Sequence, residues 1–94
     1  MRKQPRIKIY GTEHCSYCTA ARMLLKKRSL HYEDVLVSRD AALREEMERL
    51  SGRRSVPQIL IGDVSVGGFD ELYELDRSGG LDRVLREQAP DPGE

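Results

Sequence analysis

Two cysteines stand three positions apart in the segment Cys15-Ser16-Tyr17-Cys18, and they are the only cysteines in the 94-residue chain. A Cys-x-x-Cys pair between a strand and a helix is typical of a dithiol that cycles between its thiol and disulfide forms. The pair therefore predicts thiol–disulfide exchange, in which a thiolate attacks a disulfide sulfur.

Two other roles are open to such a pair, namely half of a zinc site or a structural disulfide. A structural zinc ion needs four ligands, and besides the two cysteines the chain offers only His14 and His31. A disulfide that closes so short a loop constrains little of the unfolded chain. We therefore expect no structural metal and interpret the pair as redox-active.

The elements around the pair assign a different role to each cysteine. The alternating segment Arg6–Tyr10 predicts a strand that ends at Gly11, and apolar residues at helical spacing predict a helix from Cys15 onward. Unpaired N–H groups and the helix dipole favour an anion at a helix N-terminus. Cys15 is therefore the expected nucleophile, and Cys18, one turn further on, the expected resolving thiol.

The rest of the chain predicts a mixed sheet. The pattern indicates strands at 31–37, 58–61 and 64–66 and helices at 40–50, 69–77 and 81–87. Strands joined through a helix run parallel, whereas the short connection Gly62-Asp63 requires an antiparallel hairpin. We expect an α/β fold of order βαβαββαα, with a single domain at 1–88 and a flexible tail at 89–94.

Charge and hydropathy exclude two classes of partner. The 16 Lys and Arg residues balance the 16 Asp and Glu residues, so no basic excess is present to neutralise nucleic-acid phosphates. The basic segment Met1–Pro5 leads into a short alternating stretch, and no apolar run approaches the length of a membrane span. We expect a soluble, cytoplasmic monomer that binds neither nucleic acid nor membrane.

Three separated motifs carry a resemblance to the glutaredoxin family, especially its small bacterial dithiol class. Cys15–Cys18 resembles the family's Cys-Pro-Tyr-Cys site, Ser55–Ile59 its Thr-Val-Pro loop, and Gly67–Asp70 its Gly-Gly-x-Asp turn. Asp76–Leu81 is similar to its junction between two helices, so the resemblance covers nearly the whole chain. It implies a thioredoxin fold, with a four-stranded mixed sheet and helices on both faces. It also implies a glutathione-dependent oxidoreductase that reduces disulfide-containing or glutathionylated proteins.

The resemblance also implies where glutathione binds. A cis Pro57 would present the backbone of Val56 to the tripeptide, Arg53 would contact its glycyl carboxylate, and the helix start would hold its γ-glutamyl end. Each of these residues also has a simpler interpretation. Pro57 could be a trans proline that starts a strand, and Asp70 could be an ordinary helix N-cap. Arg53 could be a solvated loop residue, with Arg54 contacting the glycyl carboxylate in its place. The implied glutathione-binding residues are Thr12, Tyr17, Arg53, Val56, Pro57, Gly68, Phe69 and Asp70.

Two departures from the family pattern leave alternatives open. Thr12 stands where the family commonly has a lysine, and Ser16 stands where it has proline. Family members without that proline include some that hold a 2Fe–2S cluster through the nucleophilic cysteine, here Cys15, and glutathione. A second alternative is a thioredoxin-like redoxin reduced by a flavoenzyme. The Gly67–Asp70 turn and the lack of tryptophan argue against it.

Overall fold

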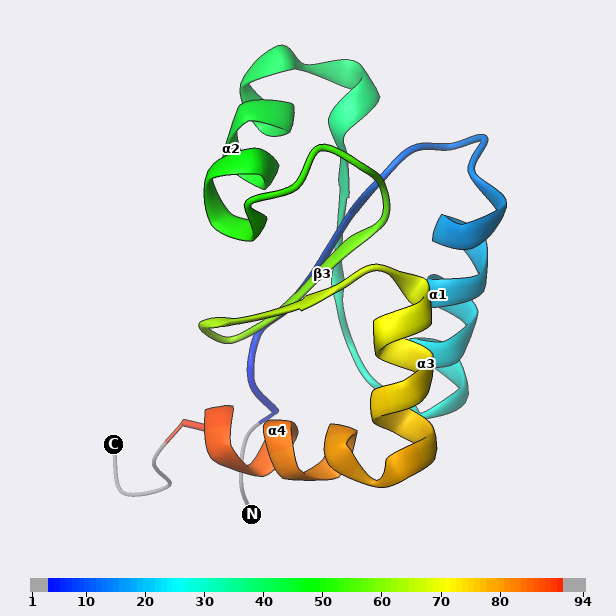
Figure 1. The fold of residues 1–94 in the computed structure, drawn as a ribbon, viewed down its shortest axis with the longest axis vertical. Coiled ribbons are helices and arrows are strands. Elements are labelled where there is room, and N and C mark those ends of the chain that lie inside the picture. Colours follow the sequence, from blue (N-terminus) through cyan, green and yellow to red (C-terminus); the bar gives the residue numbers. More distant parts are fainter. Residues whose placement is uncertain (1–3, 91–94) are drawn as a thin grey trace.

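The computed structural model describes residues 4–90, which form one four-stranded sheet with helices on both faces (Figure 1). The elements in chain order are β1 (Ile7–Gly11), α1 (Ser16–Lys27), β2 (Glu33–Leu36), the 3₁₀ turn η1 (Val37–Arg39), α2 (Ala41–Ser51), β3 (Gln58–Ile61), β4 (Val64–Gly67), α3 (Phe69–Ser78) and α4 (Gly80–Gln88). The predicted order is confirmed. Of the predicted tail, residues 91–94 lie outside the described residues, as do Met1–Lys3 of the basic N-terminal segment.

The sheet has the strand order β2-β1-β3-β4. β1 and β2 pair in parallel across the α1 connection, while β3 pairs antiparallel with both β1 and β4. The sheet is therefore mixed, as the sequence pattern predicts. The dithiol follows the end of β1, the strand second from the edge of the sheet.

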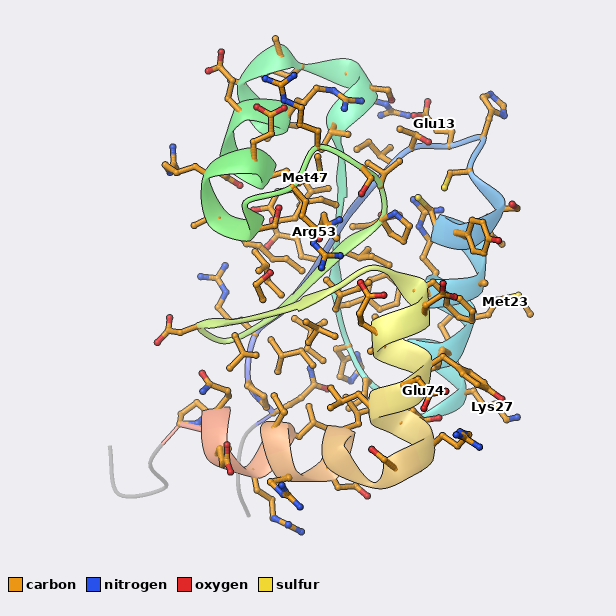
Figure 2. All side chains as sticks on the ribbon, in the orientation of Figure 1. Glu13, Met23, Lys27, Met47, Arg53 and Glu74 are labelled. Atoms are coloured by element: carbon orange, nitrogen blue, oxygen red, sulfur yellow. The ribbon has the colours of Figure 1, made fainter. Side chains whose placement is uncertain are left out.

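Alternation along the two central strands builds a separate core on each face. Ile7 and Ile9 of β1 face α1, α3 and α4, in a core that also holds Leu72. Tyr10 of β1 belongs to the opposite core, beneath α2, where Met47 is fully buried (Figure 2). The first core anchors α1 and α3, the two helices whose N-termini form the site described below.

The predicted strand at 31–37 is too long at both ends. His31 leaves the ladder because the Gln4 side chain binds its backbone: the His31 N–H donates to Gln4 Oε1 at 2.9 Å, and Gln4 Nε2 donates to the His31 carbonyl at 2.6 Å. At the other end Val37 begins η1 and is buried in the core beneath α2. Burial of Val37 and capping of α2 by Asp40 turn the chain away from the sheet edge.

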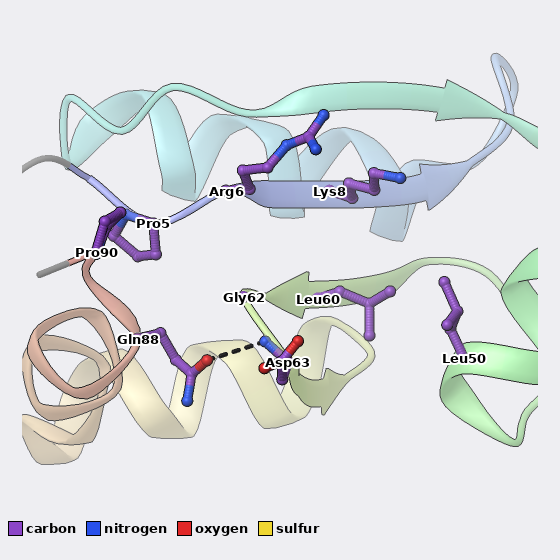
Figure 3. Close-up of a pocket in the computed structure, with 9 residues that line it drawn as sticks. All are labelled: Pro5, Arg6, Lys8, Leu50, Leu60, Gly62, Asp63, Gln88 and Pro90. Atoms are coloured by element: carbon purple, nitrogen blue, oxygen red, sulfur yellow. Dashed lines mark hydrogen bonds between the residues drawn. The ribbon is translucent and has the colours of Figure 1, made fainter. Parts of the chain in front are cut away.

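The β3–β4 hairpin is fixed from outside by the last residue of α4. Gln88 Oε1 accepts a hydrogen bond from the Asp63 N–H at 2.9 Å (Figure 3). The hollow beside this contact is lined by Arg6, which directly precedes β1, and by Lys8 in the first half of that strand. It therefore lies where β1 begins, whereas the cysteines follow the end of β1. In residues 4–90 no helix has the length and apolar character needed to cross a membrane.

Candidate active site

Cys15 is the N-cap of α1, and its sulfur occupies the position that a capping oxygen usually takes. Its backbone is extended (φ −121°, ψ 113°), and its Sγ accepts a hydrogen bond from the Cys18 N–H at 3.2 Å. Such a bond to one of the unpaired donors of a helix start stabilises negative charge on the acceptor. Cys15 is partly exposed and both cysteines are free thiols, so Cys15 is the thiol that an incoming disulfide can reach.

Cys18 lies beneath Cys15 and is fully buried. Burial raises the pKa of the Cys18 thiol to about 11, and its hydrogen bond with Cys15 adds to that rise. A raised pKa keeps the Cys18 thiol neutral, and a neutral thiol is a poor nucleophile. The two cysteines therefore lie in different environments, one partly exposed at a helix start and the other buried.

A hollow of about 270 Å³ opens next to Tyr17, the residue that precedes Cys18, although neither cysteine is among its lining residues. Its volume is close to the lower end of the range for small-ligand sites, roughly 300–1,000 Å³. Tyr17, two residues after Cys15, forms one wall, and its ring centroid lies 6.3 Å from that of Phe69. The hollow is lined by Tyr17, Arg53, Ser55, Val56, Pro57, Gln58, Gly68, Phe69, Asp70 and Glu71.

The floor of the hollow is the Val56–Pro57 peptide, which is cis. Pro57 is buried and precedes β3. A Cβ added at Gly68 would lie 3.4 Å from the Pro57 carbonyl oxygen, so the backbone before α3 packs closely on this turn. The trans reading of Pro57 is wrong.

Arg53 is held over the hollow by Glu71 of α3. Arg53 Nη1 lies 2.7 Å from Glu71 Oε1, the same oxygen that accepts a hydrogen bond from the Gly68 N–H at 2.9 Å. The Gly68 hydrogen bond and the Arg53 guanidinium together hold the pKa of Glu71 below its usual range. Figure 2 shows Arg53 between α2 and α3. Arg54 instead pairs with Glu48 of α2.

The hollow brings together seven of the eight residues predicted to bind glutathione; Thr12 is not among its lining residues. The Thr12 carbonyl accepts a hydrogen bond from Arg22 at 3.1 Å. Asp70 is not the N-cap of α3, a position that Gly68 occupies. Asp70 lies in the first turn with its side chain exposed, which leaves its carboxylate at the rim of the hollow.

Sequence reasoning missed Glu71, which fixes both Arg53 and the start of α3. An acidic residue three positions after a helix N-cap is a recognised signal for a reciprocal capping contact. The signal was weak here because the N-cap residue is Gly68 rather than serine or threonine.

The described residues do not by themselves fit a metal cluster. Iron–sulfur clusters are held by cysteine thiolates, and one chain presents a single accessible thiol, Cys15, because Cys18 is buried. Within residues 4–90, no three or more His, Cys, Asp or Glu side chains are grouped to hold a metal ion. A cluster would require ligands from outside this chain.

Comparison with known proteins identifies relatives across most of the chain. The family model described as Glutaredoxin matches residues 7–66. Glutaredoxin 3 of Escherichia coli strain K12 is 44% identical over 80 residues, which are 85% of this chain and 96% of that protein. A glutaredoxin of Pseudomonas aeruginosa is 40% identical over 81 residues, covering 86% of this chain and 96% of its own.

Solved structures give the same result. Glutaredoxin from Brucella melitensis is 40% identical, with a TM-score of 0.76 over 87% of this chain and 89% of its own. A buckwheat glutaredoxin, solved as a complex with glutathione, is 25% identical, with a TM-score of 0.78 over 89% of this chain and 78% of its own. The architecture described above is therefore shared with these proteins.

Proposed function

Because the chain belongs to the glutaredoxin family and is a thiol–disulfide oxidoreductase, we propose that glutathione is the reductant that it uses at Cys15. The observation that carries this proposal is the hollow between Tyr17, the cis Pro57 turn and the start of α3. It brings the cis peptide, the first turn of α3 and the Arg53 guanidinium to one small-molecule-sized space. The buckwheat relative was solved with glutathione bound.

Each part of the hollow suits one part of the tripeptide. The N-terminus of α3 suits the γ-glutamyl carboxylate, since unpaired N–H groups and the helix dipole attract anions. Asp70, at the rim, suits the ammonium group beside that carboxylate. A guanidinium carries five N–H donors, so Arg53 can hold Glu71 and the glycyl carboxylate together.

The proposed reaction with a glutathionylated protein has two exchanges. The Cys15 thiolate attacks the glutathione sulfur, a Cys15–glutathione disulfide forms, and the protein sulfur leaves as a thiolate. A second glutathione thiolate then attacks the glutathione sulfur bound to Cys15. Oxidised glutathione is released and the Cys15 thiolate is restored. One free glutathione is oxidised for each protein thiol regained, because the other half of the released disulfide is the glutathione that was bound to the protein.

A protein disulfide requires Cys18. Cys15 attacks one sulfur of the substrate and forms a mixed disulfide, while the other substrate sulfur leaves and takes up a proton. Cys18 then loses its proton and attacks Cys15 Sγ, so the Cys15–Cys18 disulfide forms and the substrate sulfur that was bonded to Cys15 leaves and takes up a proton. Two molecules of glutathione reduce that disulfide. One chain holds both thiols and the whole hollow, so we propose that the protein acts as a monomer. We also propose that it acts in the cytoplasm, because glutathione keeps thiols reduced there.

Turnover with two reducing systems tests the proposal. Reduction of a glutathionylated peptide would be followed with NADPH, using either glutathione plus glutathione reductase or thioredoxin reductase alone. We expect turnover only in the glutathione system. Equal or faster turnover with thioredoxin reductase would identify a thioredoxin-like redoxin instead and overturn the proposal.

Removing the charged groups of the hollow is expected to weaken the use of glutathione. Asp70→Ala and Arg53→Ala should each raise the apparent KM for glutathione about tenfold, since each loses a charge-assisted contact worth about 1.5 kcal/mol. The measurement is the rate of the coupled reaction over a range of glutathione concentrations, with thermal unfolding to confirm that each variant is folded.

Arg54→Ala is the matched control for Arg53→Ala. It removes the neighbouring arginine, which pairs with Glu48 of α2 rather than lining the hollow. Its KM should stay within about twofold of the parent, as is usual for a surface side chain. Equal KM changes in the two arginine variants would show that the hollow is not where glutathione binds.

A further inference from the structure

Arg22 links three segments directly beneath the dithiol. It lies on α1, and its side chain is only 15% exposed. Its Nε lies 3.1 Å from Asp34 Oδ2 on β2, and its Nη2 donates to the Thr12 carbonyl at 3.1 Å. The guanidinium is thus held in one place by the neighbouring strand and by the loop that leads into the dithiol.

Arg22 also lies beside the Cys18 thiol. The two residues are four positions apart on α1 and therefore share one face of the helix. A Cβ added at Gly11 would lie 2.9 Å from Cys18 Sγ and 3.2 Å from Arg22 Nη2. Because both atoms lie close to that single Cβ position, the Arg22 guanidinium is within roughly 4–6 Å of the Cys18 sulfur. Over that distance a charge affects the ionisation of a neighbouring group.

This placement matters in the step that Cys18 performs. To attack a mixed disulfide on Cys15, Cys18 must first lose its proton, and burial and Cys15 both oppose that loss. The Thr12 N–H and the Arg22 guanidinium favour it. Asp34 lies against the same guanidinium and offsets part of its charge.

We propose that Arg22 is a positioning residue for the resolving step, and that Asp34 sets how much positive charge the Cys18 thiol meets. In that step the Cys18 thiolate forms a bond to Cys15 Sγ, and the bond from Cys15 to the substrate sulfur breaks. The proton lost by Cys18 passes to water, and the departing substrate sulfur takes one up. This inference rests on the proposed role of Cys18 as the resolving thiol.

Alkylation of Cys18 by iodoacetamide over a pH series tests the inference without any turnover, so it is independent of the use of glutathione. All variants would carry Cys15→Ser, which leaves Cys18 as the only thiol. Arg22→Met should shift the alkylation profile to higher pH, and Arg22→Lys, which keeps the charge, should restore most of the parental profile. Asp34→Asn should shift the profile the opposite way, to lower pH.

The expected change in rate is modest and has a defined size. A thiol with a higher pH midpoint is also intrinsically more nucleophilic, with a Brønsted slope of about 0.4–0.5. Each pH unit of upward shift should therefore slow alkylation below the midpoint by about three- to fourfold. Lys26→Met, which removes an exposed cation from the end of the same helix, should leave the profile unchanged.

The opposite signs separate an electrostatic role from a structural one. If the Arg22–Asp34 pair only braces α1 against β2, then Arg22→Met and Asp34→Asn would loosen the same contact and move the profile in the same direction. That result, or unchanged profiles in both variants, would overturn the inference. Should Arg22→Met fail to fold by circular dichroism, Asp34→Asn decides alone: a profile unchanged or moved to higher pH rejects the inference.

Discussion

The Cys15→Ser protein is expected to lose both the reduction of glutathione mixed disulfides and the reduction of protein disulfides, each by at least about 10³-fold. Loss of an essential nucleophile in other enzymes costs up to about 10⁶-fold. Cys15 is the thiol placed at the helix start, and Cys18 is buried with its pKa raised to about 11, so Cys18 cannot substitute. The measurement is steady-state turnover of a glutathionylated peptide and of a small protein disulfide.

Cys18→Ser is the matched comparison, since it makes the same chemical change one helical turn away. It should keep the reduction of glutathionylated peptide, because glutathione can resolve the Cys15 mixed disulfide. It should lose most reduction of protein disulfides, because the intramolecular attack on Cys15 is absent. Retained deglutathionylation in Cys15→Ser, paired with its loss in Cys18→Ser, would reverse the two assigned roles.

Local patterns were sufficient to predict the features that depend on neighbouring residues. The alternation of Ile7 and Ile9 with polar neighbours identified β1, and the glycine at position 62 identified the hairpin. The helix start at Cys15 follows from the same reasoning, and it places a sulfur among unpaired N–H donors. These features need no knowledge of how distant segments meet.

Three of the features that sequence reasoning missed depend on side chains from distant segments. Gln4 delays the start of β2 by binding the backbone of His31, which is 27 residues away. Arg53 meets Glu71 at a separation of 18 residues, and charge alone does not separate it from the neighbouring Arg54. The Arg22–Asp34 pair joins a helix to the strand that follows it. In each case tertiary packing determines which side chain is the partner, and the charge and periodicity of the sequence do not specify that packing.

Gly11→Ala is expected to destabilise the fold and to impair the chemistry of Cys18 at the same time. The added Cβ would lie 2.9 Å from Cys18 Sγ and 3.2 Å from Cys18 Cβ, closer than carbon and sulfur atoms pack. Overpacking of this kind typically costs about 1–3 kcal/mol of unfolding free energy. In a domain of this size each kcal/mol lowers Tm by roughly 4–8 °C. Because the atoms that must move belong to the resolving cysteine, reduction of protein disulfides should fall more than deglutathionylation.

Gly52→Ala provides a control with a similar loss of stability and a different cause. Gly52 caps α2 with φ 74°, a left-handed conformation that costs an L-residue about 1–2 kcal/mol, and an added Cβ there would have no atom within 4 Å. Its Tm should therefore fall by a comparable amount while the ratio of the two activities stays parental.

If Gly52→Ala changes that ratio as much as Gly11→Ala does, then general destabilisation explains both variants. The ratio would then say nothing about contact between β1 and Cys18. A changed ratio in Gly11→Ala alone would show that the absence of a side chain at Gly11, the end of β1, is what allows the resolving thiol to lie against the sheet.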